Sequence, residues 1–395
     1  MNLEIAENHT MFTQLRHDIH RHPELGFKEL KTSQMIVEKL TEWGFDEVHS
    51  GIAQTGVVGV LKGMGSSSKS IGLRADMDAL SMDEENTFAH KSCHSGVMHG
   101  CGHDGHTAML LASAWYLSKY RNFSGTVNFI FQPAEEGLGG AKVMIDEGLF
   151  ERFPCDRIYG MHNMPGIPEG EFHLREGALL ASSDRFNIII EGVGGHAAMP
   201  ERVVDPAIIM SNIVLAAQSI VSRNVSPLES AVISITDLHC GSGTYNVIAS
   251  TAIMMGCVRA FDEKVRKRVI ERLTTVVEQT AIAHGATATL RIQKGGYPAT
   301  VNHKEATRIA AEVAEKVVGE DKVNKNCTPL GGSEDFSYML QQVPGCYLLL
   351  GNGSTGEKGG VSVHNPSYDF NDEIIPQGAS FFIELVKSEL SLVTS

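Results

Sequence analysis

The chain has 395 residues, of which 42% are hydrophobic and 20% are charged, and this length favours two domains over a single hydrophobic core. Its formal net charge of −14 at pH 7 argues against a nucleic-acid-binding surface, which needs a basic stripe. The same charge argues against attachment to a membrane through a polybasic patch.

Helices and strands alternate through the first part of the chain. In chain order the sequence predicts helices over residues 10–22 and 32–43, strands over 57–61 and 71–74, a helix over 104–120, and strands over 126–131 and 156–161. After residue 294 a strand is predicted over 347–350 and a helix over 378–392. This alternation is typical of an α/β protein with a mostly parallel sheet that helices cover on both faces.

The pattern changes between residues 184 and 294. Strands are predicted over 185–193, 231–238, 251–261 and 287–292, and helices over 263–284 and after Asp205, the N-cap that precedes Pro206. The resulting β-α-β-β-α-β order is that of a ferredoxin-like split unit. We therefore predict that residues 184–294 form a small domain inserted into a larger one made of residues 1–183 and 295–395.

Three features favour a cytoplasmic protein with reduced thiols. The seven cysteines are odd in number and form no Cys-x-x-Cys pair. The N-terminal segment, residues 1–18, is polar and acidic and has no apolar signal-peptide core. The most apolar helical stretch, residues 207–221, contains serine, asparagine and glutamine, so we expect that it does not span a membrane.

Residues 98–106, Met-His-Gly-Cys-Gly-His-Asp-Gly-His, combine one thiol, three imidazoles and a carboxylate with glycines between them. Glycine allows the backbone to bend sharply around an ion, and cysteine and histidine are ligands that zinc and similar metals prefer. This segment therefore predicts a metal site. The alternative is a polar loop that caps the helix beginning near Asp104.

Other ligand-type residues follow predicted strands elsewhere in the chain. They lie in Arg-Ala-Asp-Met-Asp (74–78), Gln-Pro-Ala-Glu-Glu-Gly (132–137), Met-His-Asn (161–163) and, shortly beyond the last strand, His-Asn-Pro (364–366). In open α/β sheets ligands bind outside the carboxyl ends of the strands, so these segments can converge on one site. The pattern predicts a metal-dependent hydrolase.

Glu135 and Glu136 are adjacent carboxylates. In an extended segment adjacent side chains point to opposite sides, so one carboxylate can bind a metal while its neighbour faces the substrate. Two carboxylates crowded into one cleft repel each other, and a cation offsets that repulsion. The alternative interpretation of this pair is a charged loop in solvent.

Six segments together resemble the aminoacylase and carboxypeptidase metallopeptidase family, in particular its hippurate hydrolase and indoleacetyl-amino-acid hydrolase branch. The segments are residues 73–80 (LRADMDAL), 98–106, 132–137, 162–165 (HNMP), 194–198 (GGHAA) and 364–372. The resemblance runs nearly from end to end of the chain. It implies that the larger domain is catalytic and metal-binding, and that residues 184–294 form a dimerisation or lid domain of a homodimer.

The resemblance also implies two divalent metal ions in each subunit, with zinc, manganese, nickel or cobalt as candidates. The implied ligands are Cys101, His103, Glu136, His162 and His364, and the implied catalytic base is Glu135. Two cations can polarise an amide carbonyl and lower the pKa of a water, whose proton Glu135 takes and hands to the departing amine. Five ligands spread along the chain are typical of an open catalytic site, because a structural zinc is closed by four ligands near in sequence.

Residues of the small domain have implied roles in substrate binding. By the resemblance, His196 stabilises the oxyanion of the tetrahedral intermediate in the cleft of the partner subunit. Asn246 and Arg259 are candidates for binding the carbonyl or carboxylate of the substrate. The chain departs from the family beside Asn246, since Ala249 and Ser250 stand where the family has a proline and an acidic residue.

Three residues are expected to support the metal ligands through hydrogen bonds: Asp76, Asp104 and His106. Asp104 is also expected to cap the helix that begins there. The N-terminal histidines, including His17 and His20, are expected to lie in solvent on a helix surface.

We therefore expect an amidohydrolase that cleaves N-acyl amino acids such as N-benzoylglycine, with a small-molecule substrate and no nucleic-acid or membrane partner. The alternative within the same family is a small-peptide carboxypeptidase or dipeptidase. Two further classes stay open: a thiol hydrolase with Cys101 as nucleophile and His103 or His106 as base, and a non-catalytic metal-binding protein. A chelator separates the thiol enzyme from the metal enzyme. Glu135 argues against a binding protein, which needs no proton shuttle.

Overall fold

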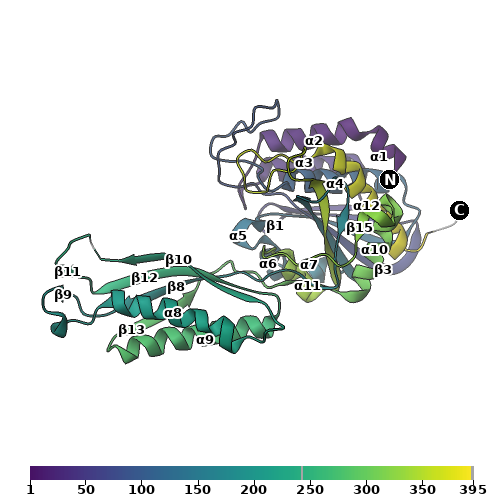
Figure 1. The fold of residues 1–395 in the computed structure, drawn as a ribbon. Helices are drawn as coiled ribbons and strands as arrows, with labels where there is room; N and C mark the ends of the chain where they lie inside the picture. Colours follow the sequence, from purple (N-terminus) through teal and green to yellow (C-terminus); the bar gives the residue numbers. More distant parts are fainter. Residues whose placement is uncertain (242, 393–395) are drawn as a thin grey trace. The chain divides into compact units, whose positions relative to one another are not determined.

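The computed structural model describes residues 1–241 and 243–392 and divides the chain into two compact units (Figure 1). The large unit consists of Met1–Leu179, Val301–Thr328 and Asp335–Ser395, and the small unit of Leu180–Thr300 and Pro329–Glu334. Residues 329–334 are predicted in the larger domain but belong to the small unit. The reason is a backbone pairing, since Leu330 bridges to Leu180 and its carbonyl accepts the Ala181 N–H at 3.1 Å.

The large unit contains an eight-stranded mixed sheet with the order β1-β2-β4-β3-β5-β16-β6-β15. Its strands are β1 (Glu47–Ile52), β2 (Gly56–Lys62), β3 (Gly65–Asp76), β4 (Ser124–Gln132), β5 (Arg157–Pro165), β6 (Phe172–His173), β15 (Val323–Asn324) and β16 (Gly345–Gly353). The central strands β4, β3, β5 and β16 are mutually parallel, and β1 and β2 form an antiparallel edge. β16 is buried along its whole length, as in sheets covered on both faces. The predicted α/β class with a mostly parallel sheet is confirmed.

Helices cover both faces of this sheet (Figure 1). They are α1 (Leu3–Glu7), α2 (His9–Arg21), α3 (Leu30–Glu42), α4 (His103–Lys119), α5 (Glu135–Leu138), α6 (Gly140–Asp146), α7 (Leu149–Arg152), α10 (Lys304–Val318), α11 (Phe336–Gln342) and α12 (Ile375–Glu389), with the 3-10 turns η2 (Glu320–Lys322) and η3 (Asp372–Ile374). Successive residues of β5 point to opposite layers. The Tyr159 hydroxyl donates to Glu389 of α12, whereas a Cβ at Gly160 would lie 3.6 Å from Phe336 of α11.

Helix α4 is the core helix of the large unit. It packs against β3, β4 and β5 and contacts α2 and α12. Most of its residues are buried all round its axis, which is typical of a helix enclosed in a core. Its first turn therefore has a fixed position at the carboxyl ends of the parallel strands, where the sequence predicts the site.

The small unit is an antiparallel sheet covered by two helices. Its sheet has the order β10-β12-β8-β13, with β8 (Asp184–Glu191), β10 (Ala231–Cys240), β12 (Thr251–Ala260) and β13 (Thr287–Ile292). The helices are α8 (Pro206–Asn224) and α9 (Glu263–Ala283), and short pieces are β9 (Gly195–His196), η1 (Pro200–Arg202) and β11 (Val247–Ile248). The ferredoxin-like β-α-β-β-α-β order is therefore confirmed. The chain passes between the units at β7 (Gly177–Leu180) and β14 (Thr300–Asn302), and again on either side of residues 329–334.

Local signals explain where α8 begins and which side it buries. The Asp205 side chain accepts the Ala207 N–H at 2.8 Å, so Asp205 is the N-cap, as predicted. By length and composition alone α8 is apolar enough to cross a membrane. Ile209 and Ile213 are buried in the core of the small unit, which accounts for the apolar composition of that face, whereas Ile208 and Leu215 of the same helix are exposed.

Candidate metal centre

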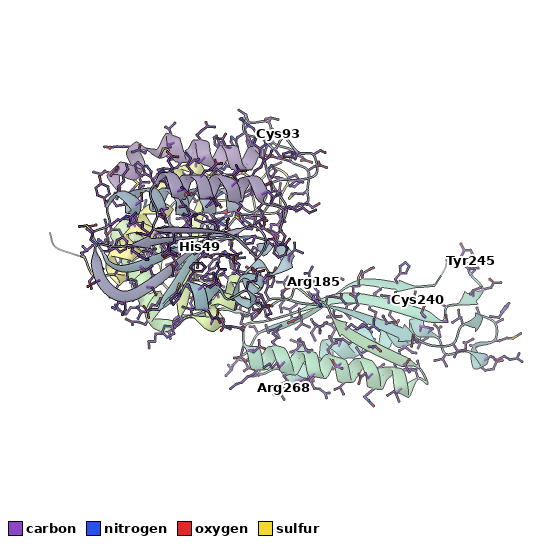
Figure 2. All side chains as sticks on the ribbon, turned by 180° about the vertical axis from the view of Figure 1, so that it is seen from behind. His49, Cys93, Arg185, Cys240, Tyr245 and Arg268 are labelled. Atoms are coloured by element: carbon purple, nitrogen blue, oxygen red, sulfur yellow. The ribbon has the colours of Figure 1, made fainter. Side chains whose placement is uncertain are left out.

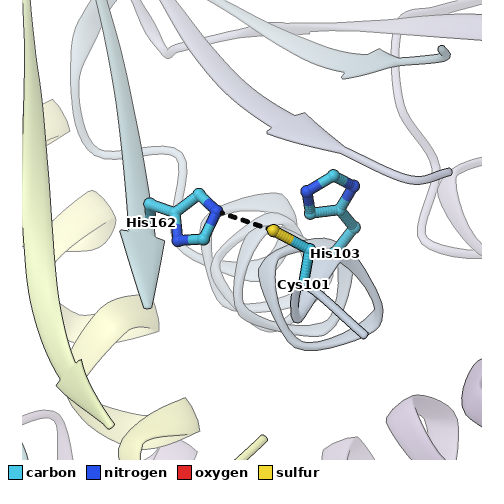
Figure 3. Close-up of side chains that lie close together, drawn as sticks. All are labelled: Cys101, His103 and His162. Carbon is cyan, nitrogen blue, oxygen red and sulfur yellow. Dashed lines mark hydrogen bonds between the residues drawn. The ribbon is translucent and has the colours of Figure 1, made fainter. Parts of the chain in front are cut away.

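Cys101, just before α4, and His103, its first residue, stand on either side of a sharply bent glycine. Gly102 has φ +94°, and a Cβ there would lie 2.3 Å from Oδ1 of Asn163. Both the backbone conformation and the space therefore require glycine at this position. The bend places the Cys101 thiol and the His103 imidazole side by side at the start of α4 (Figure 3).

The expected ligands and the expected base, Glu135, lie in three overlapping groups. In each group the ligand atoms are within 4.8 Å of one another: Cys101, His103 and His162; Cys101, Glu136 and His364; and His103, Glu135 and Glu136. Sγ of Cys101 is 3.3 Å from Nε2 of His162 on β5 (Figure 3). Nε2 of His364 is 3.1 Å from a Glu136 oxygen. The structure thus brings these six side chains together from four separate segments.

His364 reaches this group from a loop. Its backbone has φ +62°, an uncommon value for a residue other than glycine. Its N–H donates to the Gly100 carbonyl at 2.7 Å, which ties the loop to the segment before α4. A backbone held in this way at a cluster of ligand-type side chains is typical of a functional site.

Buried carboxylates orient the histidines. Nδ1 of His103 is 3.1 Å from Asp78, and Nδ1 of His106 is 2.6 Å from Asp76. Nε2 of His106 accepts the Asn163 N–H at 2.9 Å, so the imidazole proton lies on Nδ1 and is donated to Asp76. Nε2 of His103 is buried and has no hydrogen-bond partner among the described residues. Its nearest printed contact is an Asp76 oxygen at 3.8 Å. An imidazole that is fixed through one nitrogen and makes no hydrogen bond through the other is suited to bind a cation.

Burial and neighbouring charges shift the pKa values of His103 and Cys101. Burial lowers the pKa of His103, but Asp76 and the Cys101 sulfur raise it, and the result is well above the ordinary value. Burial raises the pKa of the Cys101 thiol, and the Glu136 carboxylate raises it further. A divalent cation would displace these protons, because thiol and imidazole ligands bind in their deprotonated forms. The donor set of sulfur, nitrogen and carboxylate fits zinc and similar divalent ions.

Glu135 and Glu136 follow β4 in an irregular turn. The sequence predicts an extended segment here, but Ala134 is left-handed (φ 54°, ψ 44°) and Glu136 is not helical (φ −68°, ψ 75°) within the short α5. Glu135 is buried, and one of its oxygens accepts the Asp335 N–H at 3.3 Å. The turn, rather than strand alternation, separates the two carboxylates.

Asp104 has a different role from the predicted cap. The N-cap of α4 is Gly102, which makes no side-chain cap, and the buried Asp104 carboxylate accepts hydrogen bonds from Arg16 Nε (2.7 Å) and His20 Nδ1 (2.8 Å). His20 is therefore buried rather than in solvent, contrary to the prediction, whereas His17 is partly exposed and lies 2.9 Å from Asp372. Burial raises the pKa of Asp104, but Arg16 and His20 lower it well below its ordinary value.

Two charged residues of the large unit have positions that sequence patterns did not assign. Asp78 contacts His103 and also accepts the Glu136 N–H at 2.9 Å. Arg74 is buried and donates to Asp76 at 2.7 Å and to Asp335 at 3.2 Å. The sequence signal for both residues was the charged segment 74–78, which begins at the end of an apolar strand.

The small unit holds the remaining candidates. His196 in β9 pairs with Val247 in β11, and its Nδ1 accepts the Ala198 N–H at 3.1 Å. Asn246 is exposed in the turn before β11. The preceding residue, Tyr245, is fully exposed (Figure 2). Arg259 lies apart from them on β12, where it donates to the Gly331 carbonyl at 3.2 Å. Within this unit the structure thus brings together His196 and Asn246 but not Arg259.

Comparison with known proteins shows that the chain is similar to several hydrolases. Residues 72–388 match the model of peptidase family M20/M25/M40. The chain is 44% identical to hippurate hydrolase of Campylobacter jejuni over 388 residues, 98% of each chain. It is 38% identical to thermostable carboxypeptidase 1 of Saccharolobus solfataricus over 382 residues, 95% of this chain and 94% of the relative. It also resembles the crystal structure of a dinuclear metal-binding M20 peptidase from Bacillus subtilis, with a TM-score of 0.83, 32% identity and coverage of 96% and 98%.

Proposed function

Because this chain belongs to peptidase family M20/M25/M40, we propose that it is an amidohydrolase of N-acyl amino acids, which it splits into a carboxylic acid and an amino acid. The observation that carries the proposal is the convergence of Cys101, His103, His162 and two adjacent glutamates at the start of α4. The similarity to hippurate hydrolase over 98% of both chains supports this substrate class.

The proposed cofactor is a pair of divalent cations. The residues that would hold them are Cys101, His103, Glu136, His162 and His364. Their fit is supported by the buried Nε2 of His103, which makes no hydrogen bond among the described residues. The relative from Bacillus subtilis, which is described as dinuclear, supports the number. When bound, such ions polarise an amide carbonyl and lower the pKa of a water. Zinc, manganese, nickel and cobalt are all compatible with this donor set.

Glu135 is the proposed general base. A carboxylate oxygen of Glu135 accepts a proton from the attacking water, and the same group donates it to the nitrogen of the leaving amino acid. The Asp335 N–H holds one oxygen of this carboxylate at 3.3 Å, and a Glu135 oxygen lies within 4.8 Å of the ligand atoms of His103 and Glu136, so the carboxylate is oriented beside the cluster of ligands. The orientation is needed because proton transfer requires hydrogen-bond contact with the reacting group.

The small unit is proposed to serve a homodimer. β10 is an edge strand, and on it Val232 is 50% exposed and Leu238 is 48% exposed. An exposed apolar edge favours pairing with another chain, and two-fold dimers are the commonest soluble oligomers. In this assembly His196 donates to the oxyanion in the partner's site, and Asn246 and Arg259 bind the carbonyl or carboxylate of the substrate.

A second candidate is carboxypeptidase or dipeptidase activity, which the 38% identity to thermostable carboxypeptidase 1 favours. An assay of N-acetyl, N-benzoyl and indoleacetyl amino acids beside dipeptides separates the two candidates. The protein is stripped of metal and refilled with zinc, manganese, cobalt or nickel before each assay. We expect turnover of N-acyl amino acids only in refilled protein. Activity that resists the chelator but is lost on thiol alkylation would instead establish the Cys101 thiol hydrolase.

A further inference from the structure

Glu29 is a completely buried carboxylate that the proposed reaction does not use. It occupies the N-cap position of α3, yet its side chain makes no capping hydrogen bond to that helix. Instead, one oxygen accepts the Thr55 hydroxyl at 2.6 Å, and the other accepts the Ala134 N–H at 2.9 Å. Glu29 therefore links the loop before α3 to the turn that carries Glu135.

The residue that Glu29 holds has a conformation that alanine rarely adopts. Ala134 is left-handed, with φ 54° and ψ 44°, and it is completely buried. The loop that carries Glu29 packs closely on it, because a Cβ at Gly26 would lie 3.0 Å from the Ala134 Cα. A strained backbone of this kind persists only when its surroundings hold it in place.

Three consecutive residues of this turn are held by three different segments. The Ala134 N–H donates to Glu29, a Glu135 oxygen accepts the Asp335 N–H at 3.3 Å, and the Glu136 N–H donates to Asp78 at 2.9 Å. Glu29 makes the first of these three contacts, and the residue that it holds, Ala134, directly precedes the proposed base. Without it the left-handed turn loses the partner of its buried N–H.

We propose that Glu29 is a positioning residue, which fixes the Ala134 turn and so aims the Glu135 carboxylate at the reacting water. This inference rests on the proposed function, since it assigns Glu29 an effect through Glu135. Burial raises the pKa of Glu29 to about 7, although its contacts with Thr55 and Ala134 lower it, and Asp78 is the charged neighbour that raises it further. Glutamine therefore resembles the protonated form and can keep both contacts, with its amide oxygen toward Ala134 and its NH2 toward Thr55.

The test compares kcat and KM in the metal-loaded full-length protein for Glu29→Ala and Glu29→Gln. We expect Glu29→Ala to lower kcat by roughly 10- to 100-fold, the usual effect of a displaced catalytic group, with KM and metal content near wild type. Glu29→Gln should restore most of the kcat. The matched control is Glu24→Ala, because the Glu24 carboxylate lies in the same loop and also accepts backbone N–H groups, those of Lys31 and Thr32. This control removes a similar contact without touching the turn, so its kcat should stay near wild type.

A second measurement does not depend on activity. Hydrogen exchange of the Ala134 amide should be faster in Glu29→Ala than in wild type, and unchanged in Glu24→Ala. If wild type hydrolyses no substrate of the panel, the proposed function fails, while this exchange measurement still tests the contact. If Glu29→Ala does not fold, Glu29→Asp, whose shorter side chain cannot reach both partners, takes its place in both measurements. The proposal is overturned if kcat and Ala134 exchange stay at wild-type values, or if Glu29→Gln is as impaired as Glu29→Ala.

Discussion

Replacing Glu29 by Gln should remove a pH dependence of stability that this buried carboxyl group imposes on the fold. Burial raises its pKa to about 7 in the folded protein, against 4.5 for the exposed group. A group whose folded-state pKa is raised favours folding in its protonated form. Its stabilising contribution is therefore fully present below about pH 4.5 and is lost as the pH rises through about 7.

The size of the effect follows from these two pKa values. Their difference, 7 minus 4.5, corresponds to about 3 kcal/mol at about 1.4 kcal/mol per pKa unit. Between about pH 5 and pH 8 the linkage relation leaves about 2–3 kcal/mol, because at pH 5 most of the unfolded-state carboxyl groups are already ionised. Since Glu29 is completely buried, solvent screening does not reduce this value substantially.

The assay is urea unfolding of metal-free wild type and Glu29→Gln from about pH 5 to about pH 8, at one protein concentration. All other groups titrate in both proteins, so the difference between the two unfolding free energies isolates Glu29. We expect wild type to lose about 2–3 kcal/mol relative to the variant as the pH rises across this range. A difference that stays constant with pH would show that Glu29 titrates normally and would refute the argument from burial.

Three further predictions concern the site itself. Glu135→Gln keeps the side-chain volume and removes the proton acceptor, so turnover should fall by roughly two to four orders of magnitude while the metal content stays near that of wild type. Loss of metal would instead mean that Glu136 is the base and Glu135 the ligand. Cys101→Ser replaces an ionisable thiol with a hydroxyl that is not ionised at neutral pH, so metal occupancy and activity should both fall steeply. Full activity with full metal content would show that Cys101 is not a metal ligand. His196→Ala should lower turnover with metal content and folding intact, and mixing it with Glu135→Gln subunits should restore activity through hybrid dimers that contain one complete site. No recovery despite demonstrated subunit exchange would mean that His196 does not act across the interface.

Patterns within a few residues determined most of the regular elements. The helix predicted over 104–120 is α4 (His103–Lys119), and the Asp205 N-cap begins α8 as expected. The order of strands and helices in the small unit was also predicted from the local pattern of apolar and polar residues. This is possible because strands and helices have different periods and because a single residue can identify a helix cap. The two-residue strands β6 and β15 escaped prediction, since hydrogen bonds to neighbouring strands define them and no local period does. Strand β1 and helix α10 were not predicted either, although the buried residues of α10 recur at helical spacing.

The sequence alone also indicated which side chains could form a metal site, because ligand-type residues follow apolar strands at several places. Only the tertiary structure decided how these side chains are held. Asp104 looks like a helix cap, but its partner Arg16 is 88 residues away, and Ala134 is left-handed although alanine shows no local preference for that conformation. The ion-pair partner of a buried charge is the opposite charge that tertiary packing places beside it. A strained turn persists only where distant groups such as Glu29 hold it. Neither the partner nor the turn can therefore be predicted from neighbouring residues in the sequence.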